Sequence, residues 1–152
     1  MQLPLTPIQR SRLRKHKIRL HDIAETAADE LAVILGTTPH KARTLIALAE
    51  FQSIPSIGIR FAEDLVFLGY FRLEDLRHED GAALTHAYEK KKGYWIDPCV
   101  EDQFRLVVHV ARTRDRSMNW WDFTATRKQY RAKHGYPADR PTRAWHEVRS
   151  HQ

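Results

Sequence analysis

FQSIPSIGIRFAEDLVFLG, residues 51–69, is the stretch of sequence that decides the fold. An apolar residue and a proline precede a turn that contains Gly58, and a helix begins within two residues of that glycine. Because glycine has no Cβ, backbone N–H groups of the turn and of the first helical turn can approach one phosphate, which the helix macrodipole also attracts. Ile57 is placed to fill the apolar space between the two helices. The pattern predicts two helices joined by a phosphate-binding turn.

Helical signals dominate the rest of the chain, and no segment keeps the alternation with a period of two that strands show. Asp22 and Glu25 form a capping-box pattern, and Thr38-Pro39 and Asp97-Pro98 are typical of helix starts. The predicted helices cover residues 23–35, 39–50, 60–69, 81–92, 98–112 and 124–134. We therefore expect an all-α, compact multi-helix domain with a basic, aromatic-rich C-terminal tail.

The helix predicted over residues 98–112 is amphipathic. Val100, Phe104 and Val107 fall on one face together with further apolar residues. The opposite face is predicted to be solvated, and it carries Glu101, Arg105, His109 and Arg112.

A weak internal repeat with an offset of 20 residues aligns residues 34–48 with residues 54–68. It predicts two stacked hairpin units, of which the first lacks a glycine placed to bind a ligand. The alternative is a chance alignment, since any two consecutive amphipathic helices can be superposed in this way.

The stretch 51–69 resembles the helix-hairpin-helix family. The resemblance implies that phosphate-facing N–H groups belong to Ser56, Gly58, Arg60 and Phe61. It also implies that a monovalent cation binds the backbone carbonyls of Gln52, Ile54 and Ile57. One departure is Ser56, where the family usually has the first glycine of the turn. If this position needs a positive φ, serine costs about 1 kcal/mol there, although the guanidinium of Arg60 is placed to compensate.

A longer set of motifs is similar to the small bacterial proteins of the pathogenicity-locus family. The resemblance covers nearly everything after about residue 37, and it implies a helix-hairpin-helix fold without specifying an activity. The motifs are KARTLIALAEFQSIPSIGIRFAEDLVFLGYFRLEDL (41–76), KKKGYWIDPCVEDQFRLVVH (90–109), WWDFT (120–124) and YRAKHGYPADRP (130–141).

Charge is distributed unevenly along the 152 residues, whose net charge is +6. Residues 1–20 hold six basic and no acidic side chains, residues 21–104 hold 8 and 15, and residues 105–152 hold 11 and 4. Two basic ends therefore flank an acidic middle. This pattern favours either a polyanion touched at several places or docking of the ends onto the middle of the same chain.

The basic C-terminal region offers further contacts to nucleic acid. Arg127, Lys128, Arg131 and Lys133 lie within two turns of one predicted helix and can neutralise phosphates, or can simply form a solvated face. Arginines in the preceding loop (Arg112, Arg114 and Arg116) extend this stripe. Aromatic residues in the same region either stack on bases or fold the tail onto the domain. These are Trp120, Trp121, Phe123, Tyr130, Tyr136 and Trp145.

An enzymatic alternative comes from DNA glycosylases that carry the same hairpin, in which an aspartate at a helix start follows the hairpin. Asp97 with Arg105 downstream is similar to that pattern. However, bifunctional members have a nucleophilic lysine where this chain has Arg60, and a guanidinium does not form a Schiff base at neutral pH. Asp97 also lies well beyond the usual connection from Gly58, and a helix N-cap explains it fully. We predict no catalytic residue.

Other classes of site are not indicated. The single cysteine, Cys99, excludes an internal disulfide framework and a Cys-rich metal centre. The nine histidines form no metal-binding pattern, and no phosphate-binding glycine loop of a nucleotide enzyme occurs. No apolar run approaches the ~18 residues of a membrane helix, so a cytoplasmic protein with no membrane partner is expected.

These features together predict a sequence-independent DNA-binding accessory protein, with a role in DNA repair as one setting. It would contact the backbone of duplex or branched DNA through residues 53–58 and flanking basic segments. The competing class is a protein-interaction module whose hairpin is only structural. The expected organisation is a basic arm or frayed helix (1–20), a helix-hairpin-helix core (21–112) and a C-terminal extension packed on it (113–152).

Overall fold

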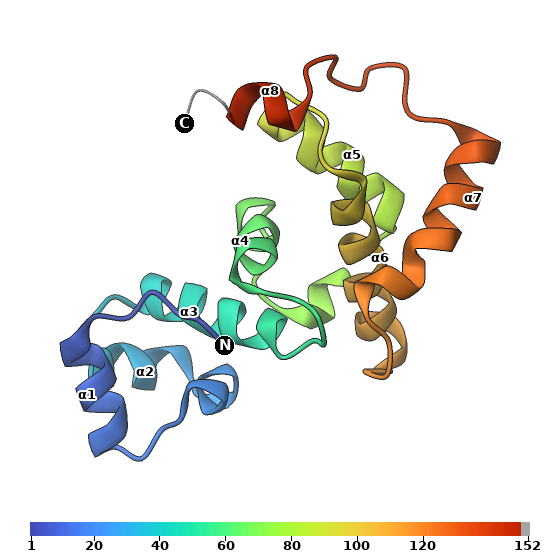
Figure 1. The fold of residues 1–152 in the computed structure, drawn as a ribbon. Helices are drawn as coiled ribbons and strands as arrows, with labels where there is room; N and C mark the ends of the chain where they lie inside the picture. Colours follow the sequence, from blue (N-terminus) through green and yellow to red (C-terminus); the bar gives the residue numbers. More distant parts are fainter. Residues whose placement is uncertain (150–152) are drawn as a thin grey trace. The chain divides into compact units, whose positions relative to one another are not determined.

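The computed structural model of the protein describes residues 1–149 and is all-α, which confirms the predicted fold class (Figure 1). Within these residues, strand-like pairing is limited to one isolated bridge between Trp95 and Ala144. The helices are α1 (Pro7–Lys15), η1 (Leu20–Glu25), α2 (Ala28–Leu35), α3 (Pro39–Gln52), α4 (Ile59–Phe67), η2 (Leu73–Leu76), α5 (Gly81–Lys92), α6 (Pro98–Thr113), η3 (Trp120–Phe123), α7 (Thr124–His134) and α8 (Trp145–Arg149), where η marks a 3₁₀ helix.

The chain divides into two compact units, with the boundary between Asp75 and Leu76. The first unit contains α1 to α4 and the second contains α5 to α8. Among the helices described, none has both the length and the apolar character that crossing a bilayer requires.

One predicted helix of the first unit is wrong: residues 23–35 belong to η1 and α2, which extended backbone at Thr26 and Ala27 separates. The Asp22 carboxylate accepts a hydrogen bond from the backbone N–H of Arg19 at 2.9 Å. It therefore bonds to the residue before η1 and does not cap a helix that begins after it. The Thr26 hydroxyl donates to the Asp22 carbonyl at 3.0 Å. Such local bonds compete with the helical ladder and end the helix early.

The N-terminal basic stretch forms a capped helix, and the residues before this helix are attached to α3. Thr6 and Gln9 complete a capping box at the start of α1, with Pro7 in the first turn. The Gln2 N–H donates to the Gln52 side-chain carbonyl at 3.0 Å, and the Gln52 amide donates back to the Gln2 carbonyl at 2.6 Å. Leu3 is buried. The first residues are thereby held at the C-terminal end of α3.

Helix α3 supplies the centre of the first unit. Thr38 caps it by accepting a hydrogen bond from the Lys41 N–H at 3.2 Å. The turn before α3 spans residues 36–38, whereas the turn after it spans residues 53–58. The two turns of the proposed repeat therefore differ in length. The buried side chains of α3 are those of Ala42, Leu45, Ala47, Leu48, Ala49 and Phe51.

The second unit is built on α5 and α6, whose predicted starts are confirmed. Asp80 accepts from the Ala83 N–H and Asp97 from the Cys99 N–H, each at 3.0 Å. The helices touch at Gly81, where a Cβ atom would lie 3.1 Å from the Arg105 Cα and 2.6 Å from its Cγ. Only glycine permits this close crossing without a shift of α6.

The polar face of α6 is covered in part, contrary to the prediction that all of it is solvated: Glu101 is buried, Arg105 and His109 are half-buried, and Arg112 is exposed. Glu101 is 1% exposed and Asp102 is fully buried. Residues of α7 bond to both carboxylates, and the segment after α7 returns to Trp95, whose N–H donates to the Arg143 carbonyl at 2.8 Å. The C-terminal region is thus an integral layer of the second unit.

Candidate nucleic-acid interface

The turn between α3 and α4 is anchored by its apolar residues. Ile54 and Ile57 are 1% and 6% exposed, so both point into the first unit. The Ile57 N–H donates to the Ile54 carbonyl at 3.2 Å and closes the turn. Pro55 and Ser56 lie between them and are half-buried. Two apolar anchors therefore leave the polar backbone of residues 55, 56 and 58 nearer to the surface.

Ser56 occupies the left-handed region of the backbone map, with φ of +63°. This is the conformation that glycine adopts without strain, and a residue with a Cβ atom is disfavoured there by about 1–2 kcal/mol. The Ser56 hydroxyl donates to the Pro55 carbonyl at 2.6 Å. Ser56, which stands where the helix-hairpin-helix family usually has glycine, therefore does have a positive φ, and its backbone is strained.

Gly58 is the N-cap of α4 and has extended backbone, with φ of −99° and ψ of −176°. Any residue can adopt this conformation. A Cβ atom built on Gly58 meets no heavy atom within 4 Å, and no side chain caps the helix. Neither backbone strain nor packing therefore requires glycine at this position, and the space beside the start of α4 is open there.

The first turn of α4 carries the other two backbone groups that the resemblance assigns. The first intrahelical bond runs from the Ala62 N–H to the Gly58 carbonyl at 3.1 Å, so helix geometry gives earlier N–H groups no partner within α4. Arg60 projects into solvent, whereas the Phe61 side chain is 3% exposed and packs inside. A cationic side chain consequently flanks the exposed start of the helix.

The carbonyls assigned to a monovalent cation belong to the end of α3 and to the turn that follows it. The Ile54 carbonyl accepts one hydrogen bond and retains a second lone pair. Gln52 ends α3, and Ile57 precedes the N-cap. Neutral backbone oxygens are suitable ligands for a hard cation, so the chemistry of these three groups suits such an ion.

Two of the four cations proposed on the C-terminal helix are engaged inside the second unit. The Arg127 Nε lies 2.6 Å from an Asp102 carboxylate oxygen, and the Arg131 guanidinium lies 2.8 Å from Glu101. Burial lowers the pKa of Arg127, but its hydrogen bond to Asp102 and the charge of that carboxylate outweigh burial and raise it above the ordinary value. Lys128 and Lys133 are exposed. Of the four cations proposed on α7, only these two lysines present their charge to solvent.

A third arginine completes the internal docking of the tail. Arg140 donates two hydrogen bonds of 3.0 Å to Glu89, whose side chain is 1% exposed. The Arg140 guanidinium also lies 3.6 Å from the ring centre of Tyr136 and 5.2 Å from that of Trp95. This tail therefore uses its arginines and part of its aromatic set to bind the core. Sequence analysis missed the buried acceptors, because their partners lie 25 to 51 residues away.

Arg112 and Asp97 have structural partners as well. Arg112 donates to the backbone carbonyl of Glu79 at 3.2 Å, and Arg114 ends α6 with φ of +62°. Arg116 is exposed. The Asp97 carboxylate caps α6, as the N-cap interpretation expects.

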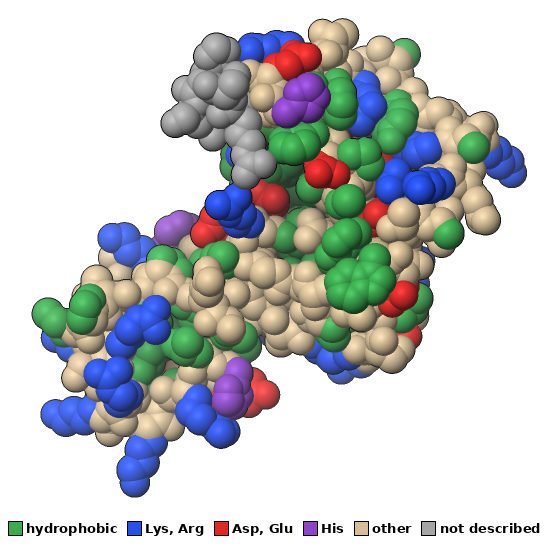
Figure 2. All heavy atoms as spheres, in the orientation of Figure 1, with side chains coloured by type: hydrophobic (Ala, Val, Ile, Leu, Met, Phe, Trp, Pro, Cys, Tyr) green, Lys and Arg blue, Asp and Glu red, His purple; other side chains and the backbone are tan. Residues whose placement is uncertain are grey.

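A second cationic feature lies in the first unit, within the N-terminal basic stretch that the sequence predicts to be an arm or a frayed helix. Figure 2 shows Lys and Arg side chains gathered over the part of this unit that includes α1. They border a pocket of about 480 Å³. The spacing of Arg10 and Arg14 on a capped helix was the available signal. The lining residues are Arg10, Leu13, Arg14, Lys17, Ile18, Arg19 and Leu20.

The fold and the site define an all-α protein whose turn between α3 and α4 is short, apolar inside and open at a glycine. The family model described as pathogenicity locus (Cdd1) matches residues 44–129 of the chain. The protein belongs to this family. Among curated proteins and solved structures, the chain has no significant match. The matched range includes the turn at residues 53–58 but excludes α1 and its pocket.

Proposed function

We propose that this protein is a sequence-independent, non-enzymatic DNA-binding accessory protein that uses residues 53–60 as a helix-hairpin-helix element. The observation that carries the proposal is the open start of α4, where the N-cap residue Gly58 has no side chain to cap the helix and meets no heavy atom where a Cβ would lie. A helix N-terminus presents N–H donors and a partial positive charge, which suit a phosphate. Arg60 adds a full positive charge beside it.

Fewer cations of α7 are available for further contacts than the sequence suggests. Arg127 and Arg131 are committed to buried carboxylates, so we assign backbone contacts in the second unit to Lys128 and Lys133. The carbonyls of Gln52, Ile54 and Ile57 would hold a monovalent cation, which would supply a positive charge next to the phosphate. None of these groups reads a base, so the expected binding is insensitive to sequence.

The proposal is tested by fluorescence anisotropy with single-stranded, duplex and branched DNA at 50 and 200 mM salt. With about four phosphate contacts, affinity should fall about 10²-fold between these concentrations. Gly58→Val should weaken binding, because the valine side chain would occupy the space that the phosphate needs. Ala83→Val is the control, since it adds apolar volume to an exposed position in the second unit.

Two results would overturn the proposal. Absence of binding at 50 mM salt would leave the hairpin as a structural connector of a protein-interaction module. Equal affinity of Gly58→Val and the wild type, with both folded, would assign DNA binding to residues other than the turn.

A further inference from the structure

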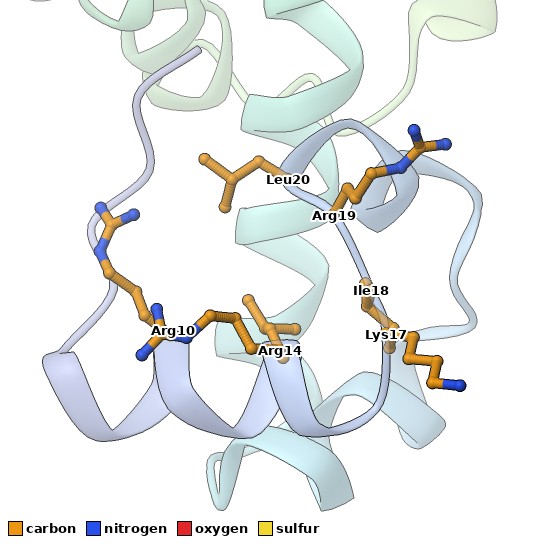
Figure 3. A pocket seen from close by; sticks show the side chains of 7 residues that line it. Arg10, Arg14, Lys17, Ile18, Arg19 and Leu20 are labelled. Atoms are coloured by element: carbon orange, nitrogen blue, oxygen red, sulfur yellow. The ribbon is translucent and has the colours of Figure 1, made fainter.

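The pocket beside α1 has walls of two kinds (Figure 3). Arg10 and Arg14 lie on one side, on successive turns of α1, while Lys17 and Arg19 lie on the other, in the chain that leaves the helix. Leu20 points into the space between them in Figure 3, and Leu13 and Ile18 complete the apolar part of the lining. An apolar lining with a cationic rim suits an organic anion better than a bare inorganic one.

The pocket is part of the folded unit. Leu13 is 2% exposed, and the Ile18 N–H donates to the Leu13 carbonyl at 2.9 Å, which turns the chain back over the end of α1. Lys17 takes a positive φ of +57° within this turn. The Arg10 guanidinium donates to the Leu3 carbonyl at 3.2 Å, so the first cation is also positioned.

The cations of the rim are poorly neutralised by the protein. None of the seven lining residues is acidic, and of the four cations Arg19 pairs with a carboxylate, that of Asp22 at 3.3 Å. Arg14 and Lys17 have no carboxylate partner among residues 1–149. Figure 3 shows the Arg14 side chain running back along α1 toward Arg10, four residues earlier. Like charges at this spacing repel one another, and a bound anion would relieve the repulsion.

We propose that this pocket binds the terminal phosphate monoester of a nucleic-acid strand, with the last nucleoside against its aliphatic side chains. The inference rests on the proposed DNA-binding function, because that function identifies the class of anion. A phosphate monoester carries about two negative charges near neutral pH, whereas each internal diester carries about one. Four cationic residues that line one pocket, with no acidic residue in the lining, therefore favour a strand end over the middle of a strand.

The test compares a short single-stranded oligonucleotide with a 5′-phosphate, with a 3′-phosphate and with hydroxyl groups at both ends. In the wild type, a terminal phosphate should raise the affinity about tenfold through charge-assisted hydrogen bonds. The double variant Arg14→Gln, Lys17→Gln should lose this gain. The control, Lys41→Gln with Arg72→Gln, removes the same charge from exposed positions of the same unit and should keep it.

Each other outcome is decisive. Equal affinity for phosphorylated and hydroxyl-ended strands would overturn the proposal, as would an equal loss in both double variants. A mononucleotide that binds as tightly as the phosphorylated strand would overturn the strand-end assignment and make free nucleotide the ligand.

The same measurements distinguish a failure of this pocket proposal from a failure of the proposed DNA binding by the hairpin. Gly58→Val should weaken binding of hydroxyl-ended duplex but leave the gain from a terminal phosphate intact. If hydroxyl-ended DNA does not bind and mononucleotide binding depends on Arg14 and Lys17, the hairpin function fails while phosphate recognition by the pocket stands.

Discussion

Arg127 donates a hydrogen bond of 2.6 Å from its Nε to Asp102, and the Asp102 carboxylate has no exposure to solvent. The Thr124 hydroxyl donates to the second oxygen of the same carboxylate at 2.8 Å. The Arg127 guanidinium, which the sequence suggests is available to a ligand, therefore forms an ion pair that joins α7 to α6. The basic tail therefore has a structural role. Its residues Arg127, Arg131 and Arg140 neutralise buried carboxylates from the acidic middle of the chain.

The first prediction compares neighbouring cations of α7. Arg127→Ala should lower the free energy of unfolding by about 3 kcal/mol or more, because it leaves a buried carboxylate without its partner. Lys128→Ala should change it by less than about 0.5 kcal/mol, since that side chain is solvated. Urea denaturation followed by circular dichroism measures both. Similar stabilities of the two variants would contradict the buried ion pair.

The second prediction concerns the strained residue of the turn. Ser56→Gly should raise the free energy of unfolding by roughly 0.5–1 kcal/mol, because glycine adopts the positive φ without strain. Ser53→Gly is the matched control: Ser53 has φ of −72° in the right-handed region, so glycine there should destabilise by a few tenths of a kcal/mol or more. Thermal denaturation of both variants tests the difference in sign. A loss of stability in Ser56→Gly would be inconsistent with strain at this position.

The third prediction separates a helix cap from a catalytic carboxylate. Asp97→Asn should keep the stability almost unchanged, whereas Asp97→Ala should cost about 1 kcal/mol, because asparagine also caps helices well. Neither change should alter DNA affinity. The accompanying assay incubates duplexes that contain uracil, alkylated or oxidised bases and then adds alkali. Strand scission by the wild type that Asp97→Asn abolishes, with folding intact, would replace the accessory role by a glycosylase activity.

The fourth prediction concerns pH and the loop after α6. Asp115 accepts hydrogen bonds from the Ser117 hydroxyl at 2.6 Å and backbone N–H at 2.9 Å, and it pairs with His109 at 3.0 Å. The Ser117 hydroxyl first, and then His109, lower the pKa of Asp115 to about 2. The folded pKa lies below the ordinary value of 3.8, so ionised Asp115 stabilises the folded state through these hydrogen bonds. Its contribution to the free energy of unfolding is complete above pH of about 4. It is lost as the pH falls towards 2.

Carboxyl-carbon NMR titration of Asp115 measures this shift directly. Ser117→Ala removes the hydroxyl donor and should move the midpoint upward, towards the ordinary aspartate value. A wild-type midpoint near 3.8 would show that the hydrogen-bonded loop does not persist in solution.

Helix ends were largely predictable because their signals are local. Asp80 and Asp97 cap the helices that the sequence assigns to them, and α7 covers residues 124–134 as expected. The break at Thr26 was not predicted, since a hydroxyl that bonds to a carbonyl four residues earlier leaves no mark in the hydrophobic pattern. Glu101 was assigned to the wrong environment for a related reason. Amphipathic spacing identifies a polar face but does not reveal whether another helix covers it.

The candidate site divides in the same way. The positive φ at Ser56 follows from the turn pattern, which specifies where a glycine normally stands. The commitments of Arg127 and Arg131 depend on partners on another helix, and the pocket beside α1 depends on how residues 17–20 fold back. Such features arise from tertiary packing, and the spacing of charges along one segment does not determine them.

The three buried ion pairs that join the tail to α5 and α6 also constrain how this protein can change over evolutionary time. Replacing one partner of a buried ion pair leaves an uncompensated charge, whereas replacing both partners by apolar side chains of similar size is often tolerated. Asp102 and Arg127 should therefore vary together among related chains, and so should Glu89 and Arg140. Glu101 should be the least free to vary, because it bonds to both Arg105 and Arg131. If the residues after α6 were exchanged for an unrelated segment, that segment would need arginines at the same positions, or the three buried carboxylates would have to be replaced as well.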